Sequence, residues 1–134
     1  MVTVNRCLGK VCSFMNEIVI YGRPASKKNS KQVFYKNGKY VVIPSRAYKA
    51  FEKDAGYQLL NYKKARLTGK LKIDYEFYQK GKLRQDFDNA IASINDVLQE
   101  YGVILNDKDI LGGSYLVIPN ARDWKTIIRI GEII

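Results

Sequence analysis

The strongest constraint on the fold is a strand pattern that lies between two helix patterns. Across residues 71–78, apolar side chains alternate with polar or charged ones. Successive side chains of a strand point to opposite faces, so this segment predicts a strand with one buried face. Apolar residues recur every three to four positions across residues 47–62 and 91–101, which predicts two amphipathic helices. Such a chain builds a sheet with helices packed against it.

Turn and capping residues delimit the other elements. Asn37-Gly38 is a strong hairpin signal, and Ser45 is a favourable N-cap for a first helix that we expect to reach about Lys64. Gly102 is the expected stop of the second helix. Further strands are predicted at residues 17–22, 32–36, 39–43, 114–118 and 124–130. The predicted fold is mixed α+β (α/β), with a mixed sheet of about six strands, two helices and the order βββ-α-β-α-ββ.

The chain of 134 residues has the size of one domain. Residues 1–14 show no clear periodicity and Met15 follows them directly, so we expect a flexible N-terminal extension and a single domain at 15–134. No apolar stretch approaches the ~20 residues of a membrane span. Cys7 and Cys12 are expected to be reduced thiols in a cytoplasmic protein, and no membrane partner is expected.

The net charge indicates the kind of partner, and the absence of histidine limits the groups that are available for catalysis. The chain has 23 lysines and arginines, 13 acids and no histidine, for a net charge of +10. An excess of this kind indicates a polyanionic partner, most simply nucleic acid. Without histidine, catalysis must use carboxylates, lysines, hydroxyls or a metal with oxygen ligands. The ten tyrosines could stack on bases, but Tyr40, Tyr48, Tyr62 and Tyr75 fall at packing positions and are expected in the core.

Acidic residues gather in one window of this basic chain. Residues 86–109 hold six acids and a single base, Lys108. Asp86 and Asp88 precede the second helix, and side chains two positions apart on an extended segment point the same way. Asp107 follows that helix, and a chain that turned back could bring it to the same end. Three converging carboxylates would suit Mg²⁺ or Mn²⁺, although helix capping alone also explains Asp86 and Asp88.

Three segments of the chain resemble the RusA-like Holliday junction resolvases, which are small phage- and prophage-associated endonucleases. Residues 22–30 (GRPASKKNS) are similar to the opening of that family after its first strand. Asp86-Phe87-Asp88-Asn89, with Asn95-Asp96-Val97-Leu98 downstream, is similar to its D-x-D-N and D-x-L motifs. Residues 102–107 (GVILND) are similar to its Gly-Val-x-x-Asp-Asp segment. The resemblance runs from about Met15 to the C-terminus.

The resemblance implies a homodimer that binds a four-way DNA junction and cuts it by paired, symmetric nicks, in the cytoplasm of a bacterial or phage-infected host cell. It implies that Asp86, Asp88 and Asp107 are catalytic and bind Mg²⁺, for which Mn²⁺ can substitute. It also implies that six basic residues hold the DNA backbone: Lys27, Lys28, Lys31, Lys80, Lys82 and Arg84.

Two positions depart from the family pattern. The motif D-x-D-N-x-x-K ends in a lysine, and this chain has Ala92 there. Lys108, beside Asp107, is the candidate to compensate for that missing cation, and Asn106 replaces the first acid of the Asp-Asp pair. An enzyme is the favoured interpretation. A branched-DNA-binding protein that does not cut is the alternative, and an RNA-binding protein with capping Asp residues is a weaker one.

Overall fold

A computed structural model of the protein describes residues 3–7, 10–25, 31–62, 65–82 and 85–133. Two α-helices and a short 3₁₀ turn lie among seven strands in this part of the chain. In order they are β1 (Thr3–Cys7), β2 (Lys10–Tyr21), β3 (Lys31–Lys36), β4 (Lys39–Pro44), α1 (Arg46–Gln58), β5 (Leu71–Lys80), α2 (Phe87–Glu100), η1 (Asp107–Asp109), β6 (Ile110–Ala121) and β7 (Lys125–Ile133). Neither helix is long and apolar enough to span a membrane.

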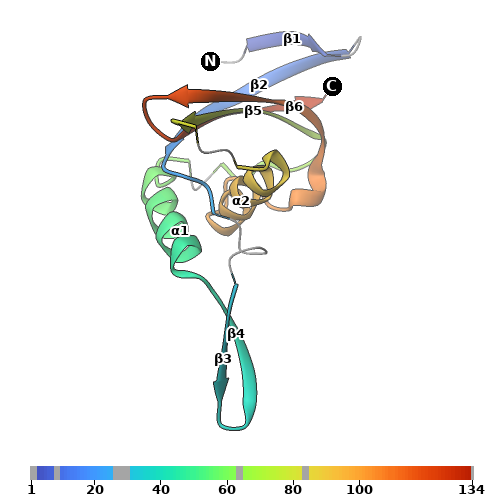
Figure 1. The fold of residues 1–134 in the computed structure, drawn as a ribbon. Coiled ribbons are helices and arrows are strands. Elements are labelled where there is room, and N and C mark those ends of the chain that lie inside the picture. The colour runs from blue at the N-terminus through green and yellow to red at the C-terminus, as the bar shows by residue number, and fades with distance from the viewer. Residues whose placement is uncertain (1–2, 8–9, 26–30, 63–64, 83–84, 134) are drawn as a thin grey trace.

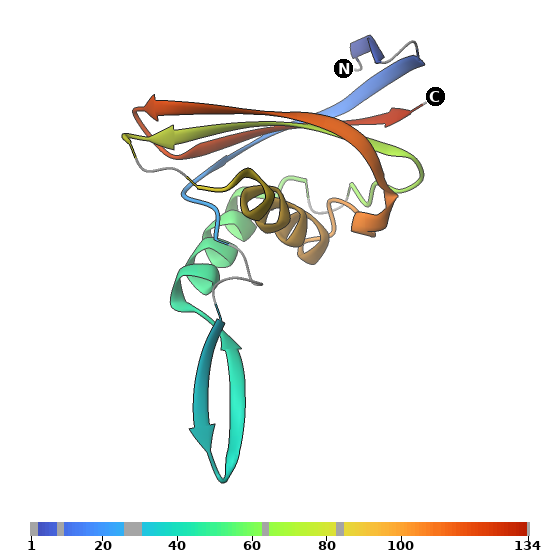
Figure 2. The same ribbon diagram turned by 45° about the vertical axis from the view of Figure 1, so that its right-hand side comes forward.

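The main sheet has the strand order β1-β2-β7-β5-β6. β5 and β6 are parallel, whereas the other neighbouring pairs are antiparallel. Parallel neighbours need a crossover connection, and α2 supplies it between β5 and β6. α1 lies on the same face of the sheet as α2, as Figures 1 and 2 show.

The core lies between this face and the two helices. Side chains of β5 alternate between buried and partly buried from Leu71 to Gln79, as the sequence predicts for residues 71–78. Ile73 and Ile128 are buried on the sheet side, and Ile94 and Leu98 are buried on α2. The opposite face of the sheet is charged, where Arg129 of β7 pairs with Glu residues of the neighbouring strands β2 and β5.

β3 and β4 form a separate two-stranded sheet. Asn37 and Gly38 occupy the turn with φ values of 53° and 76°, a conformation that these residues adopt readily. The predicted hairpin is confirmed. The hairpin projects away from the rest of the protein (Figure 1). The strands therefore form two sheets, the five-stranded main sheet and this hairpin, rather than one sheet of about six strands.

The predicted fold class and the order βββ-α-β-α-ββ are confirmed for the elements from β2 onward. β1 and the start of β2 fall within residues 1–14, where no regular element was predicted. These two strands pair with each other, from Thr3 with Phe14 to Cys7 with Lys10, although their sequence shows no clear alternation of apolar and polar residues. Ser45 caps α1 as predicted by accepting a hydrogen bond from the backbone N–H of Tyr48 at 3.2 Å.

The predicted end of α1 near Lys64 is wrong, because the helix stops at Gln58. Beyond it, the N–H groups of Leu60 and Tyr62 bond to carbonyls three residues back. These tighter turns fold the chain back over the core, where Tyr62 is partly buried. The apolar spacing that predicted more helix therefore arises from turns that pack on the same core.

Candidate functional site

Asp86 stands at the N-cap position of α2, but its side chain makes no capping hydrogen bond. Asp at this position ordinarily accepts a bond from the helix backbone. The Asp86 carboxylate is exposed, and no ion pair with it is found among the described residues. Capping alone therefore does not explain Asp86.

Asp88 lies in the first turn of α2, two residues beyond Asp86, and is also exposed. Its Oδ1 accepts a hydrogen bond from the backbone N–H of Asn89 at 2.9 Å. A carboxylate near a helix N-terminus interacts favourably with the helix dipole. Asp86 and Asp88 thus present two carboxylates at the N-terminal end of α2.

Asp107 lies at the opposite end of the same helix. α2 ends at Glu100, and Gly102, with φ of 72°, allows the chain to turn back as predicted. The backbone N–H of Asp107 donates a hydrogen bond to Oε1 of Gln99 at 3.0 Å, which holds Asp107 against the last turn of α2. The expectation that Asp107 joins Asp86 and Asp88 at one end of the helix is therefore wrong for a single chain.

The length of α2 sets the separation of these carboxylates. Gln99 lies eleven positions after Asp88, which corresponds to about 16 Å at the 1.5 Å rise of an α-helix. A metal ion needs its oxygen ligands within about 2.0–2.6 Å. Accordingly, no group of three acidic or cysteine side chains able to hold a metal ion occurs in the described ranges.

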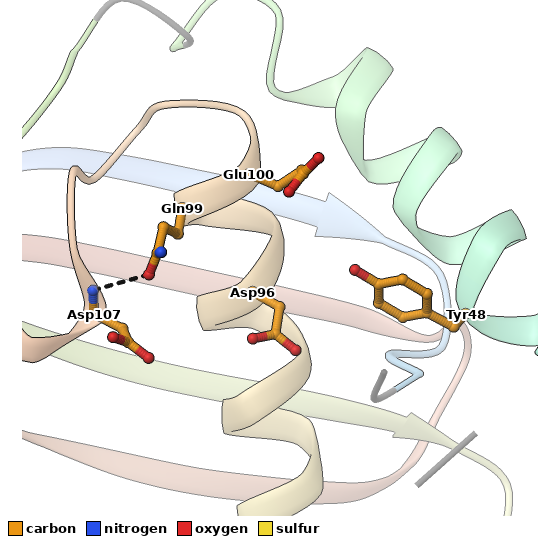
Figure 3. Close-up of a pocket in the computed structure, with 5 residues that line it drawn as sticks. All are labelled: Tyr48, Asp96, Gln99, Glu100 and Asp107. Atoms are coloured by element: carbon orange, nitrogen blue, oxygen red, sulfur yellow. Dashed lines mark hydrogen bonds between the residues drawn. The ribbon is translucent and has the colours of Figure 1, made fainter. Parts of the chain in front are cut away.

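Asp107 instead lines an acidic pocket between the two helices. The pocket has a volume of about 330 Å³ and is lined by Tyr48, Asp96, Gln99, Glu100 and Asp107. Figure 3 shows the Tyr48 ring extending from α1 toward α2, with the Asp96 and Asp107 side chains on the other side of the pocket. The i, i+3, i+4 spacing of Asp96, Gln99 and Glu100 places these three side chains on one helix face, a signal that sequence reasoning did not use.

The Tyr48 hydroxyl reflects the negative potential of this pocket. Burial is the main cause that raises the pKa of Tyr48 to about 12, and the nearby carboxylates of Glu52, Asp96 and Glu100 contribute to this rise. A phenolate is unfavourable beside carboxylates, and a cation is favourable there. The Asp107 end of α2 is thus suited to attract cations.

The predicted DNA-binding residues fall partly in the described structure. Lys80 ends β5 and Lys82 follows it, and both are exposed in the connection to α2. Lys27, Lys28 and Arg84 lie outside the described residues, and for Lys31 only the backbone, at the start of β3, is described.

Two hydrogen bonds anchor the start of the basic loop beside α2. Ser93 Oγ donates to the carbonyl of Ala25 at 3.0 Å, and Gln85 Nε2 donates to the carbonyl of Pro24 at 2.6 Å. Ser93 belongs to α2, and Gln85 directly precedes Asp86. Pro24 and Ala25, the last described residues before Lys27 and Lys28, are therefore held beside α2 and the residue that precedes Asp86.

Ala92, which replaces the lysine of the D-x-D-N-x-x-K motif, lies in the middle of α2. Ala92 is partly buried there, and no lysine or arginine forms an ion pair with Asp86, Asp88 or Asp107 within the described part of the chain. Lys108 is exposed in η1 beside Asp107. It is thus at the Asp107 end of α2, and its compensating role stays a prediction.

Comparison with known protein families gives one match of high coverage. The family described as endodeoxyribonuclease RusA matches residues 21–130, which include both helices and all three candidate carboxylates. No curated protein matches the chain significantly. The family match confirms the resemblance inferred from the three sequence segments. The chain belongs to the RusA family of Holliday junction endodeoxyribonucleases.

Proposed function

We propose that this protein nicks four-way DNA junctions with Mg²⁺-dependent sites, each built from two copies of the chain. The observation that carries the proposal is the placement of the carboxylates. Asp86 and Asp88 are exposed at one end of α2, and Asp86 makes no capping hydrogen bond, whereas Asp107 lies at the other end in an acidic pocket. Each end is incomplete by itself, and together they supply three hard-oxygen ligands.

The donor chemistry suits a magnesium ion. Mg²⁺ binds carboxylates and retains several waters, and exposed Asp side chains leave room for both. In a shared site, Asp86 and Asp88 of one copy and Asp107 of the other would hold the ion. When bound, a divalent ion activates water and stabilises the charge that develops on the phosphodiester.

A two-fold axis beside α2 would bring the two ends together. In a symmetric dimer the same surface of each copy meets its equivalent. If the two α2 helices run antiparallel across such an axis, the N-terminal end of one lies beside the C-terminal end of the other. Both shared sites then form at once, which matches a reaction that makes two symmetric nicks.

The edge of the sheet next to α2 is suited to such contact. β6 is the last strand of the sheet, and it exposes Leu111, Tyr115 and Leu116. The exposed ring of Phe87, at the start of α2, stacks on Tyr115 with 4.3 Å between centroids. A long apolar edge strand invites pairing with another chain. A second copy that covers β6 would bury this surface.

Basic side chains near the carboxylates would bind the DNA. Lys80 and Lys82 are exposed in the connection that leads to Asp86, where they would hold the DNA backbone beside the scissile phosphate. Lys108, beside Asp107, would supply the cation that Ala92 lacks. The basic loop that begins at Pro24–Ala25 would bind backbone of the same junction, in the cytoplasm of the host cell.

The carboxylate role is tested with Asp88→Asn, which removes a charge and leaves the shape of the side chain. We expect it to abolish metal-dependent nicking of a synthetic four-way junction while leaving junction binding intact or tighter. Asp123→Asn, which changes an exposed acid in the turn before β7, is the matched control and should cut normally. Cleavage by Asp88→Asn at the wild-type rate would remove the basis of the proposal.

The dimer surface has its own test. Leu116→Glu places a charge on β6, and Leu60→Glu makes the same change in the turn after α1, where the leucine is equally exposed at 58%. We expect sedimentation to show a dimer for the wild type and for Leu60→Glu, but a monomer for Leu116→Glu. A dimer that survives in Leu116→Glu would exclude this surface.

Ala92 favours a second candidate function. Without the family lysine, the protein could hold branched DNA and leave it uncut. Salt-sensitive binding of a four-way junction, with no nicks in Mg²⁺ or Mn²⁺, would favour this function over the enzyme.

A further inference from the structure

The β3–β4 hairpin is an extended projection, and its side chains at residues 33–41 are exposed to solvent. Figures 1 and 2 show it reaching away from the sheet and both helices. Tyr35 is 68% exposed and Tyr40 is 76% exposed, and Phe34 and Val41 beside them are exposed as well. The expectation that Tyr40 packs in the core is therefore wrong. A two-stranded hairpin is marginally stable by itself, so exposed aromatic residues on one point to a binding partner.

The strand register sorts these side chains onto two faces. Tyr35 pairs with Tyr40, and Lys36 pairs with Lys39. Directly opposed residues of an antiparallel pair share a face, and adjacent pairs alternate. One face of the tip therefore carries the two tyrosine rings, whose centroids are 5.2 Å apart. The other face carries the two lysines.

Charge indicates which partner the hairpin accepts. Residues 18–51, which contain the whole hairpin, hold eight lysines and arginines and no acidic residue. A second copy docked through this hairpin would bring the same positive charge against itself. A polyanion would neutralise it, and aromatic rings combined with nearby positive charge are the usual means of binding unpaired nucleotides.

We propose that the β3–β4 hairpin binds bases that are exposed at the branch point of the junction. Tyr35 and Tyr40 stack on these bases, and Lys36 and Lys39 hold the neighbouring phosphates. A base can stack on a side chain only where stacking within the duplex is interrupted, which is the case at a branch point and not within an arm. The hairpin thus distinguishes a four-way junction from linear duplex. This inference rests on the proposed junction substrate and is independent of the carboxylate site.

The test compares binding of a four-way junction and of a linear duplex of the same length, with EDTA present so that no strand is cut. Loss of one base–tyrosine stack weakens binding roughly 5- to 150-fold. We expect a loss in this range for Tyr35→Ala and for Tyr40→Ala on the junction, and a change below about twofold on the duplex. Tyr35→Phe keeps the ring and should bind the junction like the wild type. Tyr57→Ala removes a tyrosine of α1 that is 66% exposed, and is the matched control.

A photocrosslink gives a readout of stacking that a folding defect cannot imitate. 5-Iododeoxyuridine at the branch point should crosslink to the wild-type protein in the tryptic peptides of residues 32–36 and 40–46. The same probe placed within an arm should not crosslink there. Crosslinks that map elsewhere would overturn the proposal.

Several binding results would also overturn it. One is an equal loss of affinity for the junction and for the duplex, and another is unchanged junction binding by both alanine variants. A third is conversion of the DNA-free protein from dimer to monomer by Tyr40→Ala, because the hairpin would then be a contact between copies. The nicking assay is separate. If the wild type nicks junctions but the hairpin variants bind normally, only this inference fails, and if the hairpin results hold without nicking, only the proposed catalysis fails.

Discussion

Shared sites make a specific prediction about mixtures of two inactive variants. Asp88→Asn damages the N-terminal end of α2 and leaves Asp107 intact, whereas Asp107→Asn does the reverse. In a dimer with one copy of each, one shared site contains both substitutions. The other site draws Asp86 and Asp88 from one copy and Asp107 from its partner, so it contains neither.

The structure sets the expected magnitude. Because about 16 Å of helix separates Asp88 from the turn that holds Asp107, one chain cannot close the site by a side-chain movement alone. Each mixed dimer should therefore have one intact site of two, which is about half the wild-type number of sites. Random pairing makes about half of the dimers mixed, so an unsorted mixture should recover about a quarter of wild-type sites.

The assay is the nicking of a supercoiled plasmid that extrudes a cruciform. The two variants carry different affinity tags, and mixed dimers are isolated after co-expression. A single intact site cuts one strand, so the mixed dimer should yield open circles, whereas the wild type yields linear product from paired cuts. If isolated mixed dimers are no more active than either parent, each site lies within one chain and the shared-site argument is refuted.

Three further predictions concern DNA binding and stability. Lys80→Gln and Lys82→Gln should each lower the slope of log K against log salt for junction binding by about 0.9, whereas Lys70→Gln, at the opposite end of β5, should leave it unchanged. The pKa of Tyr48 is raised to about 12 from its ordinary 10.0, so the fold favours the neutral phenol, and stability should fall as the pH rises from 10 toward 12. Urea unfolding across this range should show a smaller loss for Tyr48→Phe, and an equal loss would contradict the assignment. Gly113→Ala should lower the free energy of unfolding by about 3 kcal/mol or more, because its Cβ would lie 1.8 Å from the Ile73 carbonyl oxygen and φ is +148°. Gly112→Ala meets no atom within 4 Å and should be neutral.

Local signals predicted much of the fold. The alternation across residues 71–78 corresponds to β5, and Asn37-Gly38, Ser45 and Gly102 take the turn, cap and stop conformations that their chemistry favours. Each of these features depends on residues close in sequence. The division of the strands into two sheets depends on pairing between distant segments, such as β2 with β7, which a single sequence does not reveal. β1 pairs with its chain neighbour β2, but residues 1–14 carry no periodic pattern that predicts a strand.

The candidate site was predicted less completely for the same reason. The sequence identified Asp86, Asp88 and Asp107 as candidate ligands, and the family match covers the segments that contain them. Their arrangement follows from the direction of α2, which places Asp107 at the far end of the helix rather than beside the other two. The proximity of Tyr48 and Asp107 in one pocket depends on how α1 packs against α2, and no spacing along the chain encodes it.

The exposed hairpin shows the limit of pattern reading most clearly. Tyr35 and Tyr40 sit in β-rich runs that resemble core strands. Nothing in the runs themselves distinguishes a strand that joins the main sheet from one that projects into solvent. The available signal was the positive charge of residues 18–51, which contain no acidic residue. This charge indicates a binding surface only once the hairpin is known to project into solvent.

The most direct test of the central claim is a nicking assay on a synthetic four-way junction in Mg²⁺, in Mn²⁺ and in EDTA. We predict paired, symmetric cuts with either metal and none in EDTA, with Asp88→Asn inactive in all three. Such a result would also show that the chain compensates for Ala92. Tight junction binding without cuts in either metal would contradict the account and leave a protein that binds branched DNA without cutting it.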